Sequence, residues 1–205
     1  PAVVRIWQGP GGVPQEQGTR QVVAAKLRKA RRLTGNQAPF LMANAPGPVK
    51  VTVPSPSQFP AISFQAGITD QFYPTRSDLI RDLADIVNKE YRRLGAVGCP
   101  IIQIEEPMLH LLDVPSAGDL DKEALIEVFN RQVEGVESEI WCHTCWGNPA
   151  QQSVKDESTT YEPALEELFR VNADVVTFEC ASTGGKDIEA IGKFKTDKKI
   201  AIGVI

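Results

Sequence analysis

The chain lacks the sequence features of secreted and membrane-spanning proteins. Its 4 cysteines are irregularly spaced and do not form the disulfide framework of a secreted domain. The apolar run at residues 94–104 is interrupted by Pro100 and by glycines, and it is far shorter than the roughly 20 apolar residues of a membrane helix. No basic segment precedes an apolar one, as it would in a signal peptide. We therefore expect a cytoplasmic protein with no membrane partner.

A large positive charge is also lacking. The 22 basic and 26 acidic residues give a formal net charge of -4, which argues against a nucleic-acid partner. With 205 residues, of which 42% are hydrophobic, the chain can form one sizeable core. We expect a single domain over residues 1–205, truncated at both ends, because the chain starts without Met and stops on an apolar run. Residues 1–20, rich in Gly, Pro and Gln, are expected to be a mobile loop or linker.

Apolar, β-branched runs alternate with helical patterns along the chain. The helical patterns lie at residues 75–94, where Thr75 and Asp78 predict a capping box, at 119–136 and after Pro163. Several of the runs are apolar on both faces, as in parallel strands covered by helices. We expect strands at residues 21–27, 48–53, 100–104, 139–145, 173–178 and 199–205. The predicted class is α/β.

Polar residues follow three successive predicted strands, at Glu105, at His143 with Cys145, and at Glu179. Convergence of several strand ends on one face is typical of (β/α) barrel active sites. A dinucleotide fold would instead need a Gly-rich first turn with phosphate-binding spacing, and the chain has none. This comparison favours a barrel over an open doubly wound sheet.

His143 and Cys145 are two residues apart in a predicted strand, so their side chains share one face. Imidazole and thiolate together suit Zn²⁺, and Glu179 on the next strand could supply a third ligand. Cys180 points to the other face and is the weaker candidate. A packing role remains open for all of them, because isolated cysteines are commonly small buried hydrophobes.

Other polar residues have two interpretations each. Glu105 could bind a substrate ammonium or act in acid-base chemistry, or it could be a surface acid; the surface role is favoured for Glu106. Ser55 and Ser57, in a Pro-rich turn, could line a substrate pocket or only turn the chain. His110 is expected in a solvated loop and Cys99 in the core. The five cations of residues 26–32 indicate a solvated face or a docking patch for an anionic substrate tail.

Five segments together carry a resemblance to a known family, at residues 50–57, 73–78, 101–107, 143–145 and 178–182. Over residues 21–205 the chain resembles the carboxy-terminal catalytic barrel of cobalamin-independent methionine synthase, and more closely the short single-barrel relatives of that family. The resemblance implies a (β/α)8 TIM barrel, here incomplete with about six strands. The combination of an acid before Glu-Pro, a His-x-Cys pair and a later Glu makes it specific.

The resemblance also implies an activity. It implies a zinc-dependent methyltransferase of methionine biosynthesis, which moves a methyl group from 5-methyltetrahydrofolate to homocysteine. His143, Cys145 and Glu179 match zinc ligands of the family, and Glu105 matches the acid that binds the homocysteine amino group, where the family usually has Asp. The family's remaining cysteine ligand would lie beyond Ile205. Because Glu105 stands where the family usually has Asp, one alternative is an enzyme that acts on a different thiol or electrophile, such as an epoxide. The other alternative is a non-catalytic barrel with a structural metal at His143, Cys145 and Cys180. The oligomeric state stays open.

Overall fold

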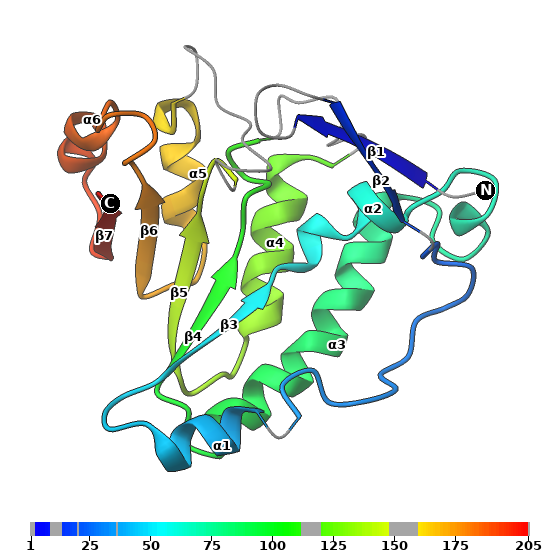
Figure 1. Ribbon diagram of the computed structural model, residues 1–205, viewed down its shortest axis with the longest axis horizontal. Helices are drawn as coiled ribbons and strands as arrows, with labels where there is room; N and C mark the ends of the chain where they lie inside the picture. The colour runs from blue at the N-terminus through cyan, green and yellow to red at the C-terminus, as the bar shows by residue number, and fades with distance from the viewer. Residues whose placement is uncertain are drawn as a thin grey trace.

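The central feature of the protein is a parallel β-sheet of five strands in the order β3-β4-β5-β6-β7 (Figure 1). The computed structural model describes residues 3–8, 14–19, 21–35, 37–111, 120–147 and 160–204. The strands are β3 (Lys50–Pro54), β4 (Ile101–Glu105), β5 (Glu139–Thr144), β6 (Val175–Glu179) and β7 (Lys199–Gly203). The predicted α/β class is therefore confirmed. Within the described residues the sheet is open, in agreement with an incomplete barrel.

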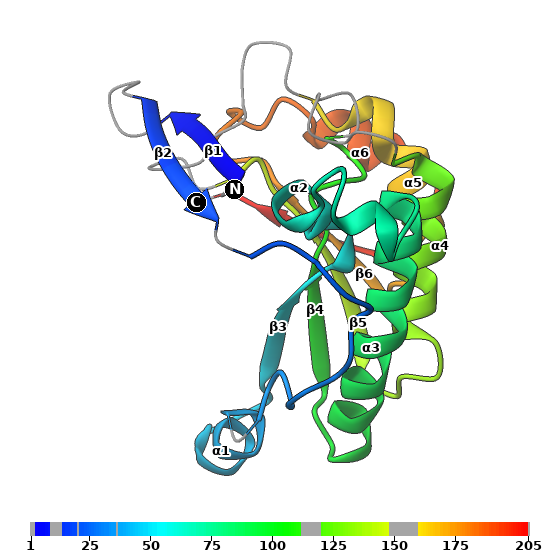
Figure 2. The ribbon, with the colours of Figure 1, turned by 90° about the vertical axis from the view of Figure 1, so that its right-hand side faces the viewer.

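Helices connect these strands and cover one face of the sheet. They are α3 (Arg76–Ala96), α4 (Lys122–Val133), α5 (Leu165–Arg170) and α6 (Ile188–Lys193). Figure 2 shows α3, α4 and α5 on the same side of the strands. No helix in the described ranges is both long and apolar enough to cross a membrane.

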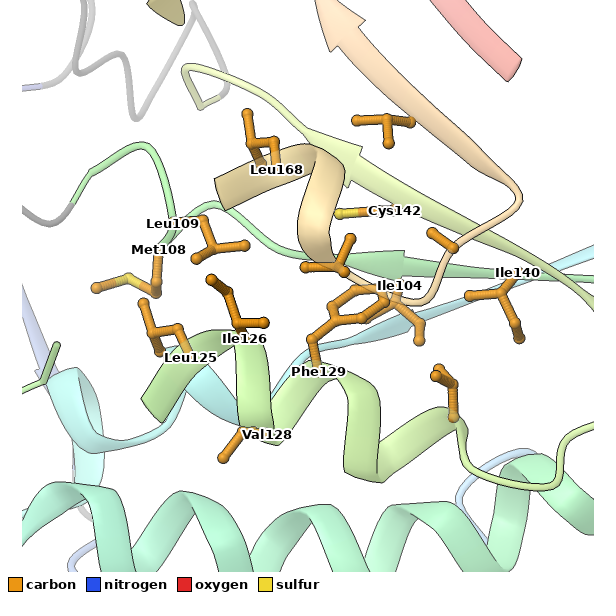
Figure 3. Close-up of a cluster of buried hydrophobic side chains, with 14 of the residues drawn as sticks. Ile104, Met108, Leu109, Leu125, Ile126, Val128, Phe129, Ile140, Cys142 and Leu168 are labelled. Atoms are coloured by element: carbon orange, nitrogen blue, oxygen red, sulfur yellow. The ribbon is translucent and has the colours of Figure 1, made fainter. Parts of the chain in front are cut away.

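The core lies between this helical layer and the sheet. Ile104 of β4 and Cys142 of β5 are fully buried, together with Leu125 and Phe129 of α4 (Figure 3). Because side chains alternate along a strand, burial of these residues turns their neighbours to the other face. That face therefore receives the polar residues Gln103, Glu105 and His143.

Helix α3 follows its sequence pattern closely. Thr75 is the N-cap and accepts a hydrogen bond from the Asp78 N–H at 3.1 Å, while the Asp78 carboxylate accepts one from the Thr75 N–H. The predicted capping box is thus confirmed. Leu79, Ile80 and Leu94 are fully buried, as helical spacing requires.

The amino-terminal part of the chain differs from the prediction. Residues 1–20, expected as a loop or linker, contain the antiparallel strands β1 (Val3–Gln8) and β2 (Pro14–Thr19). The strand expected at residues 21–27 is not formed, so five parallel strands replace the predicted six. Backbone N–H groups of residues 21–27 form hydrogen bonds to other parts of the chain instead. Val23 N–H donates to the Ser63 carbonyl at 3.0 Å, and Leu27 N–H donates to the Tyr73 hydroxyl at 2.7 Å. The β-branched run has local strand propensity, but no neighbouring strand pairs with it.

Short elements link the segment at residues 21–35 to the sheet and connect the strands. They are α1 (Gln37–Asn44), η2 (Pro56–Gln58), α2 (Pro60–Ser63), η3 (Thr69–Gln71) and η5 (Glu162–Ala164).

A buried acid on α3 fastens the segment at residues 21–35. The Glu90 side chain is 0% exposed and accepts hydrogen bonds from Lys29 at 2.6 Å and from Thr34 at 2.7 Å. Arg32 lies 3.4 Å from the same carboxylate. Burial by itself would raise the pKa of Glu90, but these partners lower it to about 2. Two of the five clustered cations therefore pair with Glu90, and a third, Lys26, lies 4.0 Å from the centre of the Tyr73 ring.

We expect Glu90→Gln to destabilise the fold by roughly 1–3 kcal/mol at pH 7, because it removes a buried anion from its partners. The pKa of Glu90 is depressed in the folded state, so this stabilisation is complete above its ordinary value of 4.5 and disappears as the pH falls toward about 2. Urea unfolding at several pH values measures the difference. Glu127→Gln, which breaks an exposed pair with Arg81, is the control and should cost less than about 0.5 kcal/mol. Equal costs for the two variants at pH 7 would contradict this role of Glu90.

Candidate metal centre

The parallel register brings polar residues from three strand ends together. Glu105 of β4 is directly opposite His143 of β5, and His143 is opposite Thr177 of β6. All three residues are therefore at the carboxyl end of the sheet and on the face away from the helices. Glu105 and His143 are among the polar residues expected at this end of the sheet, whereas Thr177 is not.

Three potential ligands converge at this end. One ligand atom from each of Glu105, His143 and Cys145 lies within 4.8 Å of the other two, and all three residues are half-buried. Within the part of the chain that the structure describes, these residues form the group of at least three His, Cys, Asp or Glu side chains whose ligand atoms lie this close together. Nitrogen, sulfur and carboxylate oxygen are the donors that Zn²⁺ takes. The donor set thus fits zinc.

His143 is oriented by the neighbouring strand. Its Nδ1 lies 2.6 Å from Thr177 Oγ1, and its Nε2 lies 3.6 Å from Glu105 Oε2, too far for a hydrogen bond. Desolvation lowers the pKa of His143, which favours the neutral imidazole that metals bind.

Cys145 follows β5, and its carbonyl oxygen accepts a hydrogen bond from His110 Nε2 at 2.9 Å. Burial raises the pKa of the Cys145 thiol above its ordinary value of 9.0. A bound cation would reverse this effect, because metal coordination removes the thiol proton.

Glu179 lies at the end of β6, on the same face as Thr177, as strand alternation predicts. Its carboxylate accepts hydrogen bonds from the Ser182 N–H at 2.7 Å and from the Ser182 hydroxyl at 2.6 Å. It does not belong to the group formed by Glu105, His143 and Cys145. Its role as a metal ligand stays a prediction, and it requires the carboxylate to turn from Ser182.

Glu106 corrects a sequence expectation. It was expected at the surface, yet it is 0% exposed. The Ser55 and Ser57 hydroxyls, predicted to contact substrate, donate to its carboxylate at 2.5 and 2.8 Å, and Met108 N–H donates at 3.0 Å. The structure therefore gives both serines, which are also 0% exposed, a buried partner inside the protein. Strand alternation carried the signal, since Glu106 shares the face of Ile102 and Ile104.

His110 is a second correction. The ring packs against Trp146 and Tyr161, with centroid distances of 4.7 and 4.9 Å, and the residue is half-buried. Burial lowers the pKa of His110 to about 4. Through its hydrogen bond to Cys145, this residue supports the loop that carries the thiol.

The other cysteines have core positions. Cys99 is 2% exposed, which confirms the prediction, and Cys180 is 1% exposed. Burial raises the pKa of Cys180 to about 11. Neither residue is in the group around His143.

Two hydrogen bonds connect Lys50, through Gln103, to the side chain of Glu105. Lys50 Nζ donates to Gln103 Oε1 at 2.6 Å, and Gln103 Nε2 donates to Glu105 Oε1 at 2.8 Å. Lys50 also lies 4.5 Å from the centre of the Trp141 ring. Gln103 could be anticipated as a same-face neighbour of Glu105, whereas the partnership of Lys50 depends on the pairing of β3 with β4.

These features define an α/β protein of the barrel class with a candidate metal centre at the carboxyl ends of its strands. The family model for the catalytic domain of cobalamin-independent synthases matches residues 48–205. The chain belongs to this family, the cobalamin-independent methionine synthases, whose catalytic domain is a TIM barrel.

Curated relatives agree with this assignment. A methionine synthase of Saccharolobus islandicus is 29% identical over 157 residues, which are 77% of this chain and 40% of the relative. Methionine synthases of Saccharolobus solfataricus and Sulfurisphaera tokodaii are 26% identical over 157 residues, again 77% of this chain and 40% and 39% of those relatives. The chain therefore spans about two fifths of the length of these proteins.

We expect Ser57→Ala to act mainly on stability, because Ser57 donates to both oxygens of the buried Glu106 carboxylate. Removing a hydrogen-bond partner from this fully buried carboxyl group should cost about 1–3 kcal/mol in the free energy of unfolding. Affinity for a thiol, measured by calorimetry, should change less than about threefold, since a structural donor does not touch the ligand. A large loss of thiol affinity at unchanged stability would instead uphold the predicted contact between Ser57 and substrate.

Proposed function

We propose that this chain is the catalytic part of a zinc-dependent thiol alkyltransferase, which transfers a methyl group from 5-methyltetrahydrofolate to homocysteine. The convergence of Glu105, His143 and Cys145 at the strand ends carries the proposal. Membership in the cobalamin-independent methionine synthase family supports it. The partners are then two small molecules, a thiol and a folate-like donor, and the cellular location is the cytoplasm.

In this proposal His143 and Cys145 hold the metal, with Glu179 as the predicted third ligand. Bound Zn²⁺ would lower the pKa of a thiol substrate and so supply a thiolate nucleophile at neutral pH. Thr177 fixes the His143 ring by its contact with Nδ1, which leaves Nε2 for the metal. Desolvation lowers the pKa of this half-buried imidazole, which favours its neutral form.

Glu105 is the group we propose for the substrate ammonium. It is half-buried at the end of β4, and its Oε2 atom faces His143, so an amino acid whose sulfur is at the metal could present its ammonium to the same carboxylate. Gln103 holds Oε1 at 2.8 Å and thereby fixes the direction of the other oxygen. A charge-assisted hydrogen bond of this kind contributes about 1.5–3 kcal/mol.

One alternative keeps the metal and changes the substrates. Glu105 is one methylene longer than the Asp usual in the family, which shifts the place of a bound ammonium and favours a different thiol or electrophile. The structural-metal alternative with Cys180 finds less support, because Cys180 is in the core and outside the group around His143.

We expect Cys145→Ser to abolish both zinc binding and alkyl transfer, because it removes the only sulfur of the group. Cys180→Ser, a matched change in a buried cysteine, should retain zinc. Metal analysis and a methyl-transfer assay of the full-length protein check both variants. Full zinc content in Cys145→Ser with loss in Cys180→Ser would reject this ligand assignment.

We expect Glu105→Gln to weaken homocysteine binding about ten- to a hundredfold in zinc-saturated protein, since the ammonium loses an anionic partner. Calorimetry with 4-mercaptobutanoate, which is homocysteine without its amino group, supplies the control. The affinity for this thiol should not be lower in the variant than in the unaltered protein. Equal losses for both thiols would show that Glu105 does not act on the ammonium.

A further inference from the structure

We infer that Glu105 is a metal ligand in the thiol-free protein, together with His143 and Cys145. The inference rests on the proposed metal centre and goes beyond it, because the family resemblance assigns Glu105 to the substrate amino group and not to the metal. The two roles belong to different states: the carboxylate is at the metal without the thiol and is available to the ammonium with it.

The first argument is the convergence of three ligand atoms. His143 Nε2 lies 3.6 Å from Glu105 Oε2, while Nδ1 is in contact with Thr177 Oγ1 at 2.6 Å, so Nε2 is the ring nitrogen that faces the carboxylate. One ligand atom from each of Glu105, His143 and Cys145 lies within 4.8 Å of the other two. One cation placed between these atoms could therefore contact all three residues.

The second argument is that Glu105 is held in place before any metal binds. Gln103 Nε2 donates to its Oε1 atom, and Lys50 fixes the orientation of the Gln103 amide by donating to its oxygen. Gln58 Nε2 and Ser55 N–H donate to the Glu105 carbonyl at 2.7 and 3.0 Å. A residue whose side chain and backbone are already held by hydrogen bonds loses less conformational freedom when it binds a metal.

The third argument concerns the competing carboxylate. Glu179 accepts hydrogen bonds from Ser182 at both of its oxygens and lies outside the group around His143, so its carboxylate must move to join that group. Glu105 needs no such change, since Oε2 already faces His143. The extra methylene of Glu relative to Asp extends the carboxylate farther from β4, toward the ligands of β5.

Metal titration of the full-length protein tests the inference. Metal-free protein is titrated with Zn²⁺ and, separately, with Co²⁺, whose absorption spectrum reports the ligands. The variants are Glu105→Gln and Glu179→Gln, with Glu139→Gln as a control that removes an acid from the same face at the opposite end of β5. Gln103→Leu serves as a second control, because it alters the support of Glu105 and leaves the ligand itself.

We expect Glu105→Gln to weaken Zn²⁺ binding at least about tenfold and to change the Co²⁺ spectrum, while Glu139→Gln changes neither. Gln103→Leu should lower the affinity and keep the spectrum, which separates a ligand from its support. Unchanged affinity and spectrum in Glu105→Gln would overturn the inference and leave the metal centre standing, with Glu179 as its carboxylate if Glu179→Gln loses zinc. If the unaltered protein binds no metal, or if Cys145→Ser binds it fully, the proposed function fails as well.

Discussion

The parallel register of β4, β5 and β6 is the constraint on which the candidate site depends. It places Glu105 opposite His143 and His143 opposite Thr177, so that three strands contribute to one small volume. A shift of one residue in β5 would turn His143 into the core and Cys142 outward. The burial of Ile104, Phe129 and Cys142 opposes such a shift, because it would put polar groups into an apolar layer.

The two faces of the sheet thus differ in role: one is apolar and packed against helices, and the other carries the polar residues of the candidate site. The helix-covered face supplies stability through apolar burial. The opposite face carries Lys50, Gln103 and Glu105, which are joined by hydrogen bonds, and the half-buried His143. Glu106 is a fully buried acid on the covered side. Its hydrogen bonds from Ser55, Ser57 and Met108 join the end of β3 to the chain after β4, and so support the backbone on either side of Glu105.

Neutral, partly desolvated ligands are typical of a site prepared for a cation. Desolvation lowers the pKa of His143 and raises that of Cys145, so without a cation both groups are held in uncharged forms. A divalent ion would supply the missing charge and draw Glu105 and Cys145 toward it. Support for the centre extends outward through Thr177 to β6 and through His110 to the aromatic rings of Trp146 and Tyr161.

The sequence by itself determined the α/β class, the capping box of α3 and the shared face of His143 and Cys145, because these follow from local periodicity and strand alternation. Alternation also held the signal for the buried Glu106. Only the tertiary structure decided that Glu105 lies nearer the His143 ligand group than Glu179 does, that His110 is packed between aromatic rings, and that residues 21–27 form no strand. These outcomes depend on contacts between residues far apart in the chain: strand register, the hydrogen bonds of Ser182, and the presence or absence of a neighbouring strand. The local sequence pattern determines on which face of the sheet a side chain lies, whereas tertiary packing determines which residues it contacts there.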